Sequence, residues 1–237
     1  MSDYWRNKFE GRTEGGHRYR SEQWFKKSVQ EHLFHIGEQA NRQNVLVDIG
    51  CGAAELTVYY APFFKKIYGF DFSSSMLQAA QKRVDSFNID NIELIQGDAC
   101  DFAEKIKTAD IIISTQVVQF LSYEQLGRHL DESLKILNPK GSIFIFWIID
   151  PKTEWLWDIG YLSDNKIGLP QLILRLLFRQ KQIISRKLQR KPGTTELGYS
   201  HAKEKIKAIC SSKNLEVEFS NALYLEYRYN ASIKRKA

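Results

Sequence analysis

The stretch VLVDIGCGAAEL, residues 45–56, decides the fold. Its first five residues are apolar except for one acid and mostly β-branched, which predicts a short buried strand, and the residues from Ala54 onward favour a helix. Gly50 and Gly52 lie between the two, at a turn where the backbone needs unusual freedom. Such a turn can cradle the phosphates of a dinucleotide, bind another nucleotide-like cofactor, or serve only as a tight packing turn.

Strands and helices continue to alternate after this turn. We expect strands at residues 44–50, 65–71, 91–98, 109–116 and 142–149, with helices at residues 54–61, 73–87 and 122–137. This alternation predicts parallel β-α-β units and an α/β, doubly wound sheet with helices on both faces. Ligands of such sheets bind beyond the carboxyl ends of the strands.

Segments on either side complete this plan. Residues 20–40 predict a helix that covers the sheet or the site, and residues 199–212 predict another. "LEVEF" (215–219) and "ALYLEYRY" (222–229), joined by a tight "SN" connection, predict an antiparallel hairpin that brings the sheet to seven strands. We divide the chain into an N-terminal helical cap (1–40), a core with the glycine turn (41–150), a helical and aromatic cap insertion (151–198), and a C-terminal helix and hairpin that complete the core (199–237).

Composition indicates one well-packed protein in a reducing compartment. The 237 residues are 43% hydrophobic, enough for a continuous core. Three widely spaced cysteines form no metal-ligand pattern, so we predict no metal site. The sequence shows no signal-peptide pattern and no apolar run long enough to cross a bilayer. We expect a cytoplasmic protein, with peripheral contact at the inner membrane surface as an alternative.

The residues around the turn exclude two phosphate-binding loops. The dinucleotide fingerprint needs a small third residue where the helix packs against the strand, and this chain has Glu55 there. A Walker A loop needs Lys-Ser or Lys-Thr after the glycines, and neither follows. An oxidoreductase or a triphosphate-binding protein is therefore disfavoured.

With a different period, the turn has an acid, two glycines and a small residue at alternate positions: Asp48, Gly50, Gly52 and Ala54. In this form it resembles motif I of the class I S-adenosylmethionine-dependent methyltransferases, whose fold is Rossmann-like. The resemblance continues in the family's order through "GFDFSSSML", "QGDACDF", "ADIIISTQVVQFL" and "LKILNPKGSIFIF". It covers about residues 45–149. It implies S-adenosyl-L-methionine as cofactor and S-adenosyl-L-homocysteine as product.

Several cofactor contacts follow from the chemistry and others from the resemblance. Gly50 and Gly52 leave room for a ribose and a methionyl chain, and the following helix N-terminus favours a carboxylate. Asp71, about 20 residues beyond the glycines, can accept hydrogen bonds from both ribose hydroxyls. The full predicted set is Asp48, Gly50, Cys51, Gly52, Asp71, Phe72, Met76, Gly97, Asp98, Ala99 and Ser114.

The resemblance assigns the remaining roles. It implies that Asp98 lies near the adenine amino group, that Phe72 and Met76 lie against the adenine, and that Asp48 and Ser114 lie beside the methionyl ammonium. Each has a structural alternative. Asp48 could only stabilise the turn, Ser114 could satisfy a strand end, and Met76 could be ordinary helix core. Cys51 could simply fill the turn.

Methyl transfer is an in-line displacement, so alignment and exclusion of water matter more than a general base. If the acceptor is a hydroxyl, His201, Asp150 or His17 could remove its proton. His201 could instead cap a helix and Asp150 could shape a turn. His129, inside a predicted helix, is expected to be structural.

The insertion offers candidates for an acceptor pocket. Trp147, Trp155, Trp157 and Tyr161 come just after the fifth strand, where aromatic rings could wall such a pocket or form a local core. We take Trp155, Trp157 and Tyr161 as substrate contacts. Residues 171–191 predict a basic amphipathic helix. It could be a simple lid, or it could contact an anionic acceptor or a membrane surface.

Three functions remain open at this stage. The first is a methyltransferase acting on a small-molecule or glycan acceptor, at oxygen. The second is an RNA methyltransferase, motivated by a net charge of +6. "STQVVQF" stands where base methyltransferases carry an Asn/Asp-Pro-Pro-aromatic motif after the fourth strand, which disfavours methylation of a base amine but leaves ribose methylation and other RNA chemistry open. We expect no nucleic-acid partner. The third is a non-catalytic protein that binds the cofactor or a lipid surface. The sequence leaves the oligomeric state open.

Overall fold

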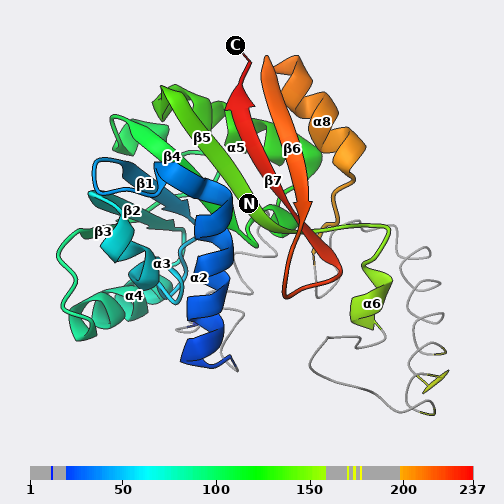
Figure 1. Cartoon of the computed structure of the whole chain (residues 1–237), viewed down its shortest axis with the longest axis horizontal. Coiled ribbons are helices and arrows are strands. Elements are labelled where there is room, and N and C mark those ends of the chain that lie inside the picture. The colour runs from blue at the N-terminus through cyan, green and yellow to red at the C-terminus, as the bar shows by residue number, and fades with distance from the viewer. Residues whose placement is uncertain are drawn as a thin grey trace.

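The computed structural model describes residues 20–158 and 198–236, together with residues 12, 170, 173, 174 and 177. Its centre is one seven-stranded sheet in the order β3-β2-β1-β4-β5-β7-β6 (Figure 1). The five strands from β3 to β5 are parallel, and β7 and β6 are antiparallel additions. The strands are β1 (Val45–Ile49), β2 (Lys66–Asp71), β3 (Ile92–Gln96), β4 (Ala109–Thr115), β5 (Leu137–Ile149), β6 (Leu215–Asn221) and β7 (Arg228–Arg235). The mostly parallel, seven-stranded α/β fold expected from the sequence is confirmed.

Helices cover both faces of the sheet. On one face α5 and α8 pack against the sheet, with α8 beside β6, and on the other α2, α3 and α4 do so, with α4 beside β3 and β2 (Figure 1). Their bounds are α2 (Glu22–Ile36), α3 (Thr57–Tyr60), α4 (Ser74–Ser86), α5 (Tyr123–Ile136), α6 (Trp155–Asp158) and α8 (Lys203–Ser212). Short 3-10 turns lie at Gly37–Gln39, Ala61–Phe63, Ala103–Lys105 and Val118–Phe120.

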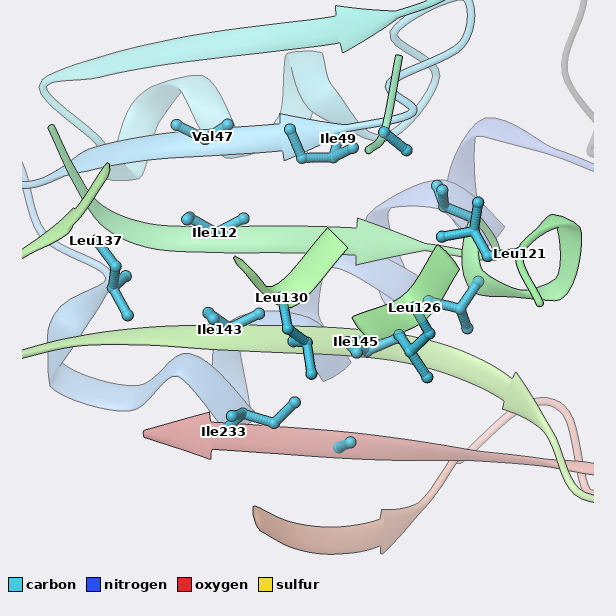
Figure 2. Packing of buried hydrophobic residues seen from close by; sticks show 14 of the residues in the cluster. Val47, Ile49, Ile112, Leu121, Leu126, Leu130, Leu137, Ile143, Ile145 and Ile233 are labelled. Carbon is cyan, nitrogen blue, oxygen red and sulfur yellow. The ribbon is translucent and has the colours of Figure 1, made fainter. Parts of the chain in front are cut away.

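The apolar strands serve two cores at once. Alternate residues of a strand point to opposite faces, so Leu46 joins the core under α2 while Val47 and Ile49 join the core under α5. Figure 2 shows the second of these cores, where Leu126 and Leu130 of α5 meet isoleucines from β4, β5 and β7. This double burial is the reason for the continuous apolar runs seen in the sequence.

Local sequence signals set the helix starts. The Ser73 hydroxyl accepts a hydrogen bond from Met76 N, which makes it the N-cap of α4 as expected. Ser122 and Gln125 form a capping box at the start of α5. Since α5 begins directly after the loop that follows β4, this cap also fixes the end of that loop.

Two predicted boundaries are wrong. The second hairpin strand begins at Arg228, not at residue 222, because Ala222, Leu225 and Tyr227 turn their side chains into the core beside α2 and leave the ladder. The fifth strand begins at Leu137, not at residue 142, since the "NPKG" segment lies inside β5, which shifts its register against β4 before Ser142. In both places tertiary packing outweighs local turn chemistry.

Candidate functional site

A cavity lies at the carboxyl ends of β1, β2 and β4, where ligands of doubly wound sheets bind. It encloses about 1000 Å³, including open solvent at its mouth. Its walls are Asp48, Gly50, Cys51, Gly52, Glu55, Leu56, Asp71, Phe72, Met76, Gly97, Ala99, Thr115, Gln116, Val117, Gln119 and Phe120. All predicted cofactor contacts except Asp98 and Ser114 are among them.

The two glycines of the turn differ in what they leave open. Gly50 has φ +76°, its N–H donates to Phe70 O over 2.7 Å, and a Cβ there would collide with the Val117 side chain. Gly52 has φ +56°, yet a Cβ there would meet no atom within 4 Å. Gly50 is therefore required by the protein's own packing, whereas Gly52 keeps part of the cavity clear.

Ala54 occupies the third small position with φ +57°, a conformation that glycine adopts more easily. Its methyl group is fully buried between α3 and α4, beside Val58, Ala80 and Val84. Burial of this methyl group offsets part of the backbone cost. The departure from glycine at this position thus has a packing reason.

Asp71 ends β2 and organises the turn. Its Oδ2 accepts from Gly52 N at 3.0 Å and its Oδ1 accepts from Ser73 N at 2.9 Å. Burial raises the pKa of this carboxyl, while these backbone hydrogen bonds partly oppose the shift. Each carboxylate oxygen keeps a second lone pair, so the side chain can still accept two hydroxyl hydrogens from a ligand.

Asp48 is buried beneath the same turn. Its Oδ2 accepts from Thr57 Oγ1 at 2.7 Å. Burial raises the pKa of Asp48 to about 7, with a smaller contribution from the charge of Asp71. A buried carboxyl with this pKa gains most from a ligand that brings a positive charge, because that charge would hold it ionised.

The wall beside β2 and β3 is largely apolar. Phe72, Met76, Gly97 and Ala99 line it together. Asp98 does not line it, and its Oδ1 accepts from Cys100 N at 2.9 Å, which shapes the loop after β3. Cys51 does line the cavity, and burial raises the pKa of its thiol, so the residue is a neutral filler of the turn at neutral pH.

Ser114 lies behind the cavity. Its hydroxyl pairs with His129 Nε2 at 2.8 Å, and His129 Nδ1 lies 2.7 Å from Ala99 O. Since a carbonyl only accepts, Nδ1 carries the proton and Ser114 donates to Nε2. Burial lowers the pKa of His129, which keeps the ring neutral. The trio joins β4, α5 and the loop after β3, as expected of a structural histidine.

Neither described candidate base lines the cavity. His201 is fully buried, and its Nε2 donates to Val118 O at 2.8 Å while burial lowers its pKa. Asp150 Oδ1 accepts from Lys152 N at 2.8 Å in the turn after β5. His201 is held close behind the loop after β4, since Val118 belongs to it. Asp150 shapes the chain leaving the sheet.

The other acceptor-side candidates are only partly described. His17, Tyr161 and the side chain of Trp157 lie outside the described residues, as does most of the segment 171–191. Trp155 begins α6 and is 36% exposed. Trp147 is fully buried against Trp24 and His32, so its ring belongs to the core.

Sequence reasoning missed one wall of the cavity. Thr115 lines it from the end of β4, and Gln116, Val117, Gln119 and Phe120 line it from the loop that follows. The rule that ligands bind beyond the carboxyl ends of strands applies to this loop as much as to the glycine turn. Applied to "TQVVQF", it would have indicated these residues.

Among the described parts of the chain, no group of three or more His, Cys, Asp or Glu side chains could hold a metal ion. Among the described residues of the cavity wall, the side chains of Asp, Glu, Lys, Arg and His type are Asp48, Glu55 and Asp71, all on the side of β1 and β2. The wall formed by the loop after β4 is neutral. The cavity therefore favours a ligand that places positive charge near β1.

Comparisons with known proteins agree with this geometry. A family model described as a methyltransferase domain matches residues 46–141. A probable S-adenosylmethionine-dependent methyltransferase of Saccharomyces cerevisiae, CRG1, is 30% identical over an alignment 150 residues long that covers 56% of this chain and 49% of the yeast protein. The chain spans about half the length of the first curated relatives it matches.

Two solved structures share the fold. Magnesium protoporphyrin IX methyltransferase from Synechocystis PCC 6803, with bound SAH, has a TM-score of 0.62 at 16% identity over 99% of this chain and 93% of that one. The mitomycin 7-O-methyltransferase MmcR has a TM-score of 0.59 at 16% identity over 89% of this chain and 54% of that one. At these identities the likeness concerns the fold.

Proposed function

We propose that this chain, which belongs to the class I S-adenosylmethionine-dependent methyltransferases, transfers a methyl group to an oxygen of a small-molecule or glycan acceptor. The observation that carries the proposal is the cavity at the ends of β1, β2 and β4, where the glycine turn, two buried acids and an apolar wall meet. Two solved structures that share the fold are named for small-molecule acceptors, magnesium protoporphyrin IX and mitomycin, and this supports the proposal of a small-molecule acceptor here.

The residues present fit the family's cofactor. Asp71 would accept hydrogen bonds from the ribose hydroxyls, and Asp48 would face the methionyl ammonium. The open space above Gly52 would admit the chain between them. Phe72 and Met76 would lie against the adenine. When bound, S-adenosylmethionine supplies a methyl group already activated by its sulfonium.

The chain's own contribution is alignment. The described residues of the cavity wall include no histidine, lysine or tyrosine, and two of its three acids, Asp48 and Asp71, are committed to the turn and to the cofactor. We therefore attribute the acceleration of methyl transfer to orientation of the acceptor oxygen and to exclusion of water. The segments 1–40 and 151–198 would enclose the acceptor. A base would be needed only for a weakly acidic hydroxyl, and since Asp150 and His201 do not line the cavity, His17 is the candidate we retain.

A binding experiment tests the cofactor site. Isothermal calorimetry with S-adenosylmethionine should give a dissociation constant for Asp71→Ala at least about tenfold above that of the parent, because charge-assisted hydrogen bonds to the ribose are lost. Asp90→Ala removes an exposed acid from another loop and should leave the constant unchanged. Melting temperatures show whether each variant is folded. Unchanged affinity in folded Asp71→Ala would refute the site.

A transfer experiment tests the activity. The protein is incubated with methyl-tritiated cofactor and small-molecule extract, and labelled compounds are separated and identified by mass spectrometry. We expect label on oxygen in a low-mass compound. Cofactor binding without label in any fraction would favour a non-catalytic role, and label on RNA would favour the RNA methyltransferase.

A further inference from the structure

Arg228, the first residue of β7, is a buried cation without a carboxylate partner. It is 5% exposed, and its guanidinium donates to Trp147 O and, over 2.8 Å, to Gln119 Oε1. Its Nε is buried and makes no hydrogen bond to the described residues, among which no ion pair includes Arg228. A buried guanidinium stays charged, and leaving it unpaired is costly.

The backbone around Arg228 is shaped to hold it. Trp147 has φ +61°, a conformation that is strained for a bulky side chain, at the point where β5 and β7 shift register. This bulge turns the Trp147 carbonyl onto the guanidinium. Asn230 fixes the bulge, because its Oδ1 accepts from Trp147 N at 3.0 Å. Strain that is so fully braced indicates a functional position.

The acid of this network lies at its far end. Glu31 of α2 is buried, and its Oε1 accepts from Asn230 Nδ2 at 3.1 Å and from Leu223 N at 3.0 Å. It therefore reaches Arg228 only through Asn230 and the Trp147 backbone. The guanidinium of Arg228 is the positive end of the network, and it contacts Gln119, which lines the cavity.

Gln119 connects Arg228 to the cavity. A guanidinium only donates, so Gln119 must present Oε1 to Arg228 and turn its amide N–H₂ the other way. That nitrogen has no hydrogen-bond partner among the described residues and is not one of the fully buried unpaired atoms, while Gln119 lines the cavity. Tyr199 N donates to Gln119 O at 2.7 Å and holds the backbone. Gln119 thus offers the cavity an oriented donor backed by a buried positive charge.

We propose that Gln119 and Arg228 bind a carboxylate of the acceptor, with Gln119 in contact and Arg228 as the positioning residue. This deepens the proposed function, on which it rests, by naming the acceptor class. The carboxylate would bind at the wall formed by the loop after β4, while the acids Asp48 and Asp71 line the cavity from β1 and β2. One contacting amide group, with a guanidinium behind it, suits a two-oxygen anion better than a phosphate, which needs more donors.

Acetate is the probe, and acetamide is its neutral counterpart of the same shape. The backbone amide resonances of Gln119 and Phe120 are followed by NMR during titration, both with saturating S-adenosylhomocysteine and without it. We expect a saturable shift with acetate that is at least about tenfold weaker with acetamide. Equal responses to the two probes, a stronger response to inorganic phosphate, or no saturable response would each overturn the proposal.

Two variants separate the roles. Gln119→Glu keeps the shape, pairs with Arg228 and replaces the donor by an acceptor, so acetate affinity should fall at least about tenfold, and melting temperatures show whether the variant is folded. Arg228→Lys keeps the charge, and Arg228→Met removes it. The preference for acetate over acetamide should survive in part in the first and disappear in the second. An unchanged preference in folded Gln119→Glu or folded Arg228→Met would overturn the assignment.

The titration does not depend on catalysis. If S-adenosylhomocysteine fails to bind while acetate still shifts the Gln119 resonance saturably, the proposed function is refuted and the anion site stands. If S-adenosylhomocysteine binds and acetate does not, only the anion site is refuted.

Discussion

Two glycines, two residues apart in one turn, have opposite consequences when a methyl group is added. In Gly50→Ala the new Cβ meets Val117 and keeps an unfavourable φ, so the free energy of unfolding should fall by about 2 to 4 kcal/mol. In Gly52→Ala the loss should be only about 1 kcal/mol, from φ alone. Urea denaturation measures both.

For cofactor binding we expect the opposite order of effects. Gly52→Ala places its Cβ in the space that the cofactor would occupy, so calorimetry should show a larger loss of cofactor affinity for Gly52→Ala than for the folded fraction of Gly50→Ala. Val117→Ala is the matched substitution for relieving the clash in Gly50→Ala, because it removes the side-chain atoms with which the new Cβ would collide. If Gly52→Ala binds the cofactor as well as the parent does, the ligand does not pass over this glycine.

Asp48 makes stability depend on pH in an unusual direction. Its pKa is about 7 in the folded protein against an ordinary 3.8, so the folded state holds a proton that the unfolded chain loses between about pH 4 and 7. A carboxyl with a raised pKa stabilises the fold at low pH, and that stabilisation is lost as the pH rises through 7. The loss amounts to at most about 4 kcal/mol.

The comparison with Asp48→Asn isolates this effect from other carboxyls. The free energy of unfolding of the parent minus that of the variant, measured in urea without ligand, should decrease from pH 5 to pH 8. Cofactor affinity should change the other way, strengthening as the pH rises to 7, because the ammonium needs an ionised partner. A difference that is flat with pH would mean that Asp48 titrates normally.

At the scale of elements, His129 of α5 connects its own helix to β4 and to the loop after β3. His129→Leu keeps much of the volume and removes the hydrogen bonds to Ser114 and to Ala99 O. The free energy of unfolding should fall by roughly 2 to 4 kcal/mol, because two buried polar groups lose their partner. Phe34→Leu, at a position of α2 that is 81% exposed, should change it by less than about 1 kcal/mol. Equal losses in the two variants would contradict the structural role of His129.

Elements were predictable where the signal is local. Runs of consecutive apolar residues indicate the double burial of β1 and β4, and serines mark the N-caps of α4 and α5. These elements lie where the sequence predicted them. The second hairpin strand was misplaced because "ALYLEYRY" has strand-forming residues whose side chains pack under α2 instead. Packing against a helix about 200 positions earlier leaves no local trace.

At the scale of the whole molecule, the site divides in the same way. The turn, Asp71 and Met76 follow from spacing within a β-α-β unit, and they line one cavity. The network of Gln119, Trp147 and Arg228 joins residues 81 and 109 positions apart, so no periodicity reveals it. The strained φ of Trp147 is likewise a product of tertiary contacts and not of its own preference.

The described residues contain no helix both long and apolar enough to cross a membrane. The contact that the sequence suggests through residues 171–191, with a lipid surface or an anionic acceptor, stays a prediction. If the basic side chains of this segment attract an anionic acceptor, deleting residues 171–191 should slow the association of the acceptor at low salt and leave the contact with Gln119 unchanged.

The placement of β7 between β5 and β6 has a consequence for biosynthesis. β6 leaves the ribosome before β7, but it has no neighbour to join until β7 arrives. Until then the long edge of β5 stays uncovered, and an uncovered strand edge invites pairing with other nascent chains. A message cut short before codon 228 should thus yield aggregates and not a smaller folded protein.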